Sequence, residues 1–219
     1  MSKSIMVWDP LIRGGHWIIV TAFALAYFTE EDLLSVHVWA GYVVGVAVVI
    51  RTLWGFVGPN RARFSDFIYP PRAVLAYLND LVRLRAVRYV GHSPAGGAMV
   101  VVLLLMLAST VVTGVMTLGV DKHAGPLALL YNSEPAGTTG SSGAEAVRTS
   151  AARVQTGETG ARESEKREES AFREVHEVLA NLTLILVGFH LGGVVLASIL
   201  HRENLVLAMI TGRKRADIR

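Results

Sequence analysis

The sequence predicts an all-α integral membrane protein: a bundle of four membrane-spanning helices with both termini in the cytoplasm. Hydrophobic residues make up 52% of the 219 residues, and the mean hydropathy of +0.42 is too high for a soluble domain. The apolar residues form four blocks, each long enough to cross a hydrocarbon core about 30 Å thick. Basic residues gather in the segments that such a bundle leaves on one side of the membrane.

The four spans are expected at residues 10–29, 33–57, 95–120 and 174–200. The unbroken apolar run of the first span is short, and it reaches spanning length by including Gly14, Gly15 and His16. No polar n-region with a small-residue cleavage site precedes it, so we expect a retained span and not a removed signal peptide. We treat residues 1–219 as one membrane domain.

The charges between the spans predict the orientation. The link after the first span carries Glu30, Glu31 and Asp32 and no basic residue. The next link and the C-terminal tail are basic, with Arg61, Arg63, Arg72, Arg83, Arg85, Arg88, Arg202, Arg213, Lys214, Arg215 and Arg219. Because basic residues favour the cytoplasmic side, both termini are expected there. This placement explains the pI of about 9.4 without a nucleic-acid-binding surface.

The cytoplasmic link, residues 58–91, contains the segment PPRAVLAYLNDLVRLRAVR, which has the pattern of an amphipathic helix. Pro70 and Pro71 suit its start. Apolar residues recur at helical spacing, namely Val74, Leu75, Leu78, Leu81 and Val82. We expect this helix to lie on the membrane surface, with the docking of a partner as the alternative.

The third link, residues 121–170, faces the outside in this orientation. Its middle is rich in Gly, Ser, Thr, Ala and charged residues and has little apolar surface, which predicts disorder or a marginal helix. A tolerated insertion is the favoured interpretation, and a docking segment for a periplasmic partner is the alternative.

Two histidines bound the segment HEVLANLTLILVGFH in the last span. A polar group at membrane depth is costly, so each needs a partner. His176 and His190 are fourteen residues apart, which is about 21 Å of helix and nearly four turns, so they project from almost the same face. His16, at the inner end of the first span, then pairs by depth with His190. His37, near the outer end of the second span, pairs with His176.

Two histidine pairs at two depths are what two bis-histidine haems need. The chain has no cysteine, which excludes thioether attachment, so the haems would be non-covalent haem b, with the four histidines as iron ligands. Small residues near the histidines would leave room for the macrocycle: Gly41, Gly45, Ala180 and Gly193. Hydrogen bonding across helices and a proton relay are the alternatives, and zinc is disfavoured because no converging ligand set is visible.

Arg13 and Arg51 are candidate contacts for the propionates of the inner haem. Snorkelling to lipid headgroups is the alternative for Arg51. The remaining histidines, His92, His123 and His201, are expected to be interfacial residues. His201 is also a candidate for contact with propionates or headgroups.

The chain resembles the bacterial cytochrome b561 family, which includes the b-type cytochrome subunit of nickel–iron hydrogenases. The resemblance is carried by VWDPLIRGGHW, HVWAGYVVGVAVVIRTLWGFVG, YVGHSPAGG, HEVLANLTLILVGFH and LHRENLVLAMITGRK. It implies a four-helix bundle that holds two haems b and passes electrons across the membrane, with His16, His37, His176 and His190 as axial ligands. The long polar third link departs from the family pattern.

These observations predict a di-haem cytochrome of the bacterial cytoplasmic membrane that is surrounded by lipid. It would carry electrons between the quinone pool and a redox partner such as a periplasmic c-type cytochrome or a hydrogenase. Two alternatives stay open. One is a superoxide:quinone oxidoreductase of the same family, which the acidic or mixed outer links disfavour. The other is a haem-free membrane anchor or transporter with a histidine proton relay.

Overall fold

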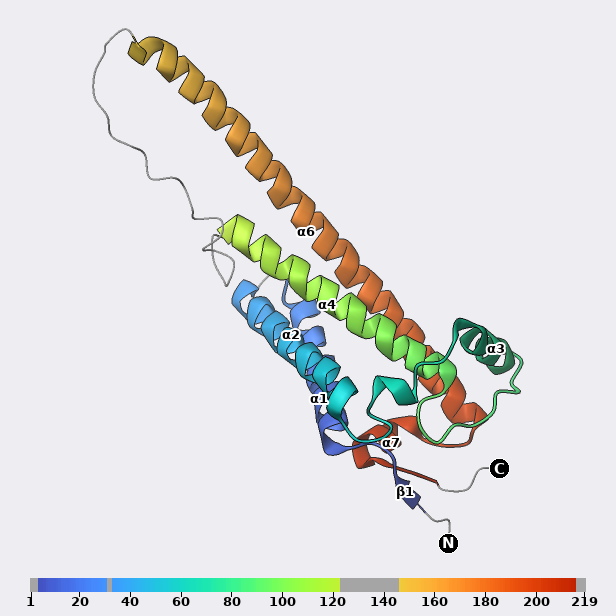
Figure 1. Cartoon of the computed structure of the whole chain (residues 1–219). Helices are drawn as coiled ribbons and strands as arrows, with labels where there is room; N and C mark the ends of the chain where they lie inside the picture. Colours follow the sequence, from blue (N-terminus) through green and yellow to red (C-terminus); the bar gives the residue numbers. More distant parts are fainter. Residues whose placement is uncertain (1–3, 31–32, 123–145, 216–219) are drawn as a thin grey trace. The chain divides into compact units, whose positions relative to one another are not determined.

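The structure is a computed structural model that describes residues 4–30, 33–122 and 146–215. Its elements in chain order are β1 (Ser4–Met6), α1 (Pro10–Phe28), α2 (Leu34–Val57), the 3-10 helix η1 (Phe64–Asp66), α3 (Pro71–Val82), α4 (Pro94–Lys122), α6 (Ala146–Leu200), α7 (Leu205–Thr211) and β2 (Arg213–Arg215) (Figure 1). The chain divides into two compact units, residues 1–111 with 180–219, and residues 112–179.

Within the described residues, four helical segments are long and apolar enough to cross a membrane: Pro10–Phe28, Leu34–Val57, Pro94–Gly119 and Ala171–Leu200. They confirm the all-helical membrane fold that the hydropathy blocks predict. Large apolar side chains on these segments are exposed, including Leu53, Leu105 and Ile185. Such side chains suit contact with lipid, because a water-soluble protein rarely leaves so much contiguous apolar surface uncovered.

The core of the first unit joins α1, α2 and the first part of α4. Ala22, Val44, Val48 and Leu107 form its buried centre. Gly45 permits a close approach here, because a Cβ at that position would lie 3.0 Å from Cγ1 of Val111. Small residues at helix contacts are a common device of membrane bundles.

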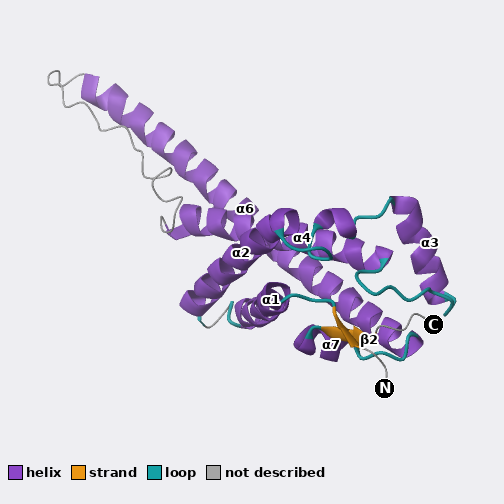
Figure 2. Ribbon diagram, turned by 60° about the horizontal axis from the view of Figure 1, so that its bottom comes forward, coloured by secondary structure: helices purple, strands orange, loops and turns teal. Residues whose placement is uncertain are grey.

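The two ends of the described chain are joined by a short antiparallel sheet of β1 and β2 (Figure 2). In its register Ile5 of β1 lies opposite Lys214 of β2. Asp9 caps α1 by accepting a hydrogen bond from the Ile12 amide at 3.0 Å, and its other oxygen accepts one from the Trp54 indole at 3.2 Å. One carboxylate therefore both starts α1 and holds it against α2.

The amphipathic segment of the link forms α3. It begins at Pro71, where a proline costs no helical hydrogen bond. Its buried residues Tyr77 and Leu81 pack against Leu196 and Leu200 at the end of α6. Leu75, Leu78 and Val82 stay exposed, so only part of the expected apolar face is used in packing.

Residues 146–170, for which the composition predicts disorder or a marginal helix, lie in α6. Ala, Gln, Glu, Lys and Arg recur in this stretch and have high helix propensity, so the helix of the last span extends beyond its apolar part. Residues 123–145, which include His123, lie outside the described residues.

Candidate haem-binding site

His16 and His190 are brought together by α1 and α6. Their ring centroids are 6.4 Å apart and their planes are inclined by 60°. Two imidazole nitrogens that each lie about 2 Å from a shared metal ion place the ring centroids about 6 Å apart. The spacing therefore fits one iron between the two rings, as the expected pairing requires.

Open space borders the helix segments that carry these two histidines. A Cβ would meet no atom within 4 Å at several of their glycines: Gly14, Gly15, Gly188, Gly192 and Gly193. A flat macrocycle held by these two histidines would need such clearance. The donor set and the space around it are therefore compatible with a bis-histidine haem.

His37 lies on α2, and its ring is oriented by a backbone group. Nδ1 lies 2.8 Å from the carbonyl oxygen of Ala26 on α1. Because a carbonyl only accepts, Nδ1 carries the proton and donates it, which makes Nε2 the nitrogen with the lone pair. Histidines that bind metals usually donate their second ring nitrogen in this way.

His176 lies on α6 in the second unit, next to Thr113 and Gly114 of α4. Its Nδ1 is 3.2 Å from Oγ1 of Thr113. Gly114 is so close that a Cβ there would lie 2.8 Å from Cε1 of the ring. Sequence reasoning missed both neighbours, because α4 contains no histidine and its Thr and Gly suit ordinary helix packing equally well. The pairing of His37 with His176 stays a prediction.

The two candidate arginines are held by backbone carbonyls. Arg13 donates to the carbonyl of Ile210 at 2.6 Å, near the end of α7, and its buried Nε has no hydrogen-bond partner within the described part of the chain. Arg51 is buried and donates to the carbonyl of Ala62 at 3.3 Å. Its guanidinium carbon lies 5.5 Å from the centre of the Phe64 ring, in the range of a cation–π contact.

His92, expected to be interfacial, is packed between aromatic rings. Its ring centroid lies 4.5 Å from that of Trp8 and 4.4 Å from that of Phe67. Burial, together with the nearby cations Arg51 and Lys214, lowers the pKa of His92 to about 3. The sequence could not show this, because this aromatic cluster joins the N-terminal segment, the residue after η1 and the segment that precedes α4.

The buried His92 in this aromatic cluster predicts a pH dependence of stability. The pKa of His92 is lower in the folded chain, so its stabilising effect is complete above the unfolded value near 6.5 and decreases as the pH falls below it. Between about pH 7 and pH 5.5 we expect a loss of about 1 kcal/mol. Thermal unfolding at both pH values measures it, and His92→Phe, which keeps an aromatic ring in the cluster, should remove most of the loss. If His92→Phe lost as much stability as the wild type between these pH values, groups other than His92 would cause the pH dependence.

A buried ion pair joins the segment between α3 and α4 to the turn between α6 and α7. Arg88 and Glu203 are joined by two hydrogen bonds, of 2.9 and 3.1 Å, and both side chains are less than a tenth exposed. Burial raises the pKa of Glu203, but hydrogen bonds from Arg88 and the Arg215 amide outweigh it and hold this pKa below its ordinary value. His201 lies beside this pair; burial, with Arg88 and Lys214 nearby, lowers its pKa.

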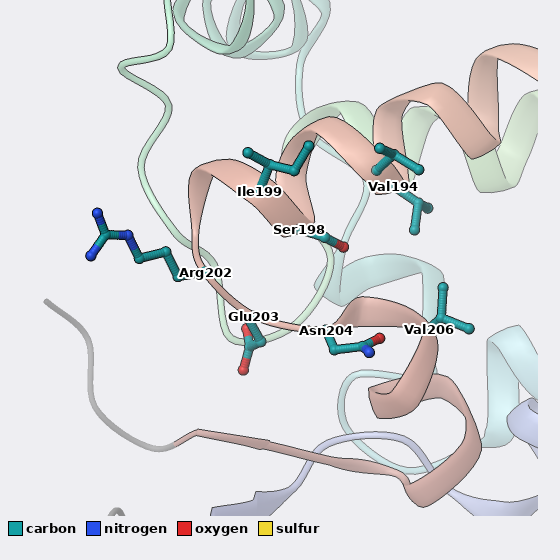
Figure 3. A pocket seen from close by; sticks show the side chains of 8 residues that line it. Val194, Ser198, Ile199, Arg202, Glu203, Asn204 and Val206 are labelled. Atoms are coloured by element: carbon teal, nitrogen blue, oxygen red, sulfur yellow. The ribbon is translucent and has the colours of Figure 1, made fainter.

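An open pocket of about 410 Å³ lies at the turn between α6 and α7 (Figure 3). It is lined by Val194, Val195, Ser198, Ile199, Arg202, Glu203, Asn204 and Val206. Its walls are mainly apolar, with polar groups at the turn. It begins one helical turn after His190.

Comparison with protein families gives a match over residues 7–212, to the prokaryotic cytochrome b561 family. The chain belongs to this family. Cytochromes b561 of prokaryotes are b-type membrane cytochromes of electron transfer, so this chain is a multi-pass bacterial membrane protein that binds b-type haem. No curated protein and no solved structure matches the chain. The family assignment removes the haem-free anchor or transporter from the alternatives.

Proposed function

We propose that this cytochrome b561 holds two haems b, one between His16 and His190 near the cytoplasmic surface and one between His37 and His176 near the opposite surface. The observation that carries the proposal is the 6.4 Å separation of the His16 and His190 rings, which fits a shared iron. Bound haem iron supplies one-electron transfer by alternating between its ferric and ferrous states.

The residues around the histidines have distinct roles in this proposal. The Ala26 carbonyl and the Thr113 hydroxyl orient His37 and His176 through their Nδ1 atoms. Arg13 and Arg51 place positive charge near the cytoplasmic ends of α1 and α2, where haem propionates would need counter-charges. The apolar bundle around them limits access of water, which sets the local dielectric.

The basic links favour a cytoplasmic location for both termini, and in that orientation the two haems would connect the two membrane surfaces. We propose that electrons pass between the quinone pool and a redox partner outside, such as a c-type cytochrome or a hydrogenase. The pocket next to α7 is our candidate for quinone entry. It is open and its walls are mainly apolar. Its polar groups include the Ser198 hydroxyl and the side-chain amide of Asn204, which also accept hydrogen bonds from the Leu205 and Leu207 amides at the start of α7.

Vesicles that contain the purified protein test this function. A reduced quinone is added outside, and ferricyanide, which does not cross lipid, is trapped inside. We expect trapped ferricyanide to be reduced faster in vesicles with the two-haem protein than in empty vesicles, and His176→Ala should lower the rate to that of empty vesicles. Equal rates in empty vesicles and in vesicles with the protein would contradict the proposal.

The same assay tests the pocket. Val195→Trp fills it, and Ile185→Trp, at an exposed position of α6 outside the pocket, is the matched control. We expect Val195→Trp to weaken the apparent quinone affinity about tenfold, which corresponds to about 1.4 kcal/mol, with unchanged haem content. Equal affinities in the two variants would place quinone elsewhere.

A further inference from the structure

The outer part of α4 carries no histidine, yet it contacts a proposed haem ligand at two successive residues. We propose that Thr113 and Gly114 are positioning residues for His176: the threonine orients the ring and the glycine gives it space. This inference rests on the proposed role of His176 as an axial ligand. In this proposal α4 contributes no iron ligand but fixes the position of one.

The threonine argument starts from hydrogen-bond chemistry. The Thr113 hydroxyl lies 3.2 Å from Nδ1 of His176 and can accept the proton of that nitrogen. With Nδ1 protonated, Nε2 has the lone pair and would be the nitrogen that binds iron. An acceptor at Nδ1 also makes the imidazole a stronger electron donor and so favours ferric over ferrous iron. Removing the acceptor should therefore raise the midpoint potential of that haem.

The glycine argument is steric. A Cβ at Gly114 would lie 2.8 Å from Cε1, 3.2 Å from Nδ1 and 3.6 Å from Nε2 of His176. The first distance is shorter than a carbon–carbon contact of about 3.5 Å. Because the ring is the movable partner, an alanine at this position would displace the imidazole from its present place. Any displacement of the ring would change the position and direction of the nitrogen that is proposed to bind iron.

The neighbouring turn of α4 offers a matched control. Thr117 also has a partly buried hydroxyl, which donates within the helix to the carbonyl of Thr113 at 2.9 Å. Replacing Thr117 by valine removes a hydroxyl of the same kind. It leaves the hydrogen bond between Thr113 and His176 in place.

The experiment is a potentiometric titration of the haems in the full-length protein. Thr113→Val should raise the midpoint potential of one haem and leave the other unchanged, Thr113→Ser should restore it, and Thr117→Val should have no effect. If Thr113→Val lost one haem while Thr113→Ser kept both, the hydroxyl would be needed to hold the ligand, which also supports the inference. Potentials in Thr113→Val that equal those of the wild type would overturn the role of the threonine.

Gly114→Ala tests the steric part separately. We expect a shifted or broadened reduced-minus-oxidised band for one haem, or loss of that haem, while the other haem is retained. A spectrum and haem content equal to the wild type would overturn the role of the glycine. His176→Ala separates the failure of the ligand assignment from the failure of this inference. If the variant keeps two haems, His176 is not a ligand. If it keeps one haem, the ligand assignment holds, and the results for Thr113 and Gly114 decide whether they position His176.

Discussion

Replacing His190 with alanine is expected to lower the haem content from two haems b per chain to one. The ring centroids of His190 and His16 are 6.4 Å apart, which fits a shared iron. A haem that would be bound by both imidazoles is expected to dissociate when one of them is removed. His176→Ala should have the same effect on the other haem. Haem extracted from each purified variant and divided by the protein concentration gives the result directly.

The two variants should differ in which haem remains. The haem that remains in His190→Ala should have the midpoint potential and the absorption bands that are absent from His176→Ala. Both should also unfold at lower temperature, because a cofactor bound only by the folded chain stabilises it. Full haem content in either variant would show that the corresponding histidine is not a ligand.

Gly97→Ala is expected to destabilise the fold strongly. A Cβ at this position would lie 2.1 Å from the carbonyl oxygen of Phe67, whose ring is almost fully buried, so the backbone of η1 or α4 would have to move. Overpacking of this kind costs about 3 kcal/mol. The melting temperature of the purified protein in detergent measures the loss.

Gly96→Ala is the control for this prediction. A Cβ there would meet only the hydroxyl of Ser93, at 3.1 Å; this hydroxyl accepts the hydrogen bond of the Gly96 amide at 3.2 Å and needs to shift by only a few tenths of an ångström. Alanine also favours the helix over glycine by about 1 kcal/mol. We therefore expect Gly96→Ala to match or exceed the wild type, and equal melting temperatures for the two variants would refute the steric argument.

The spans and the histidine positions were predictable because they depend on local properties. Apolar length marks a membrane helix, and the fourteen-residue spacing of His176 and His190 follows from helix geometry. The start of α3 at Pro71 is equally local. These features require no knowledge of which helices touch.

The features that the sequence left out depend on tertiary contacts. His92 has an unremarkable sequence context, and only the fold brings Trp8 and Phe67 to its two sides. Thr113 and Gly114 are ordinary residues of an apolar helix until α6 places His176 against them. Positions of this kind cannot be ranked from one sequence, because their function depends on a distant partner.

The most direct test of the central claim is a dithionite-reduced minus oxidised spectrum of the wild-type protein in membranes, with haem quantified per polypeptide. The proposal predicts the bands of haem b and two haems per chain. One haem per chain in correctly inserted protein would contradict the di-haem arrangement and leave one of the two histidine pairs without a cofactor.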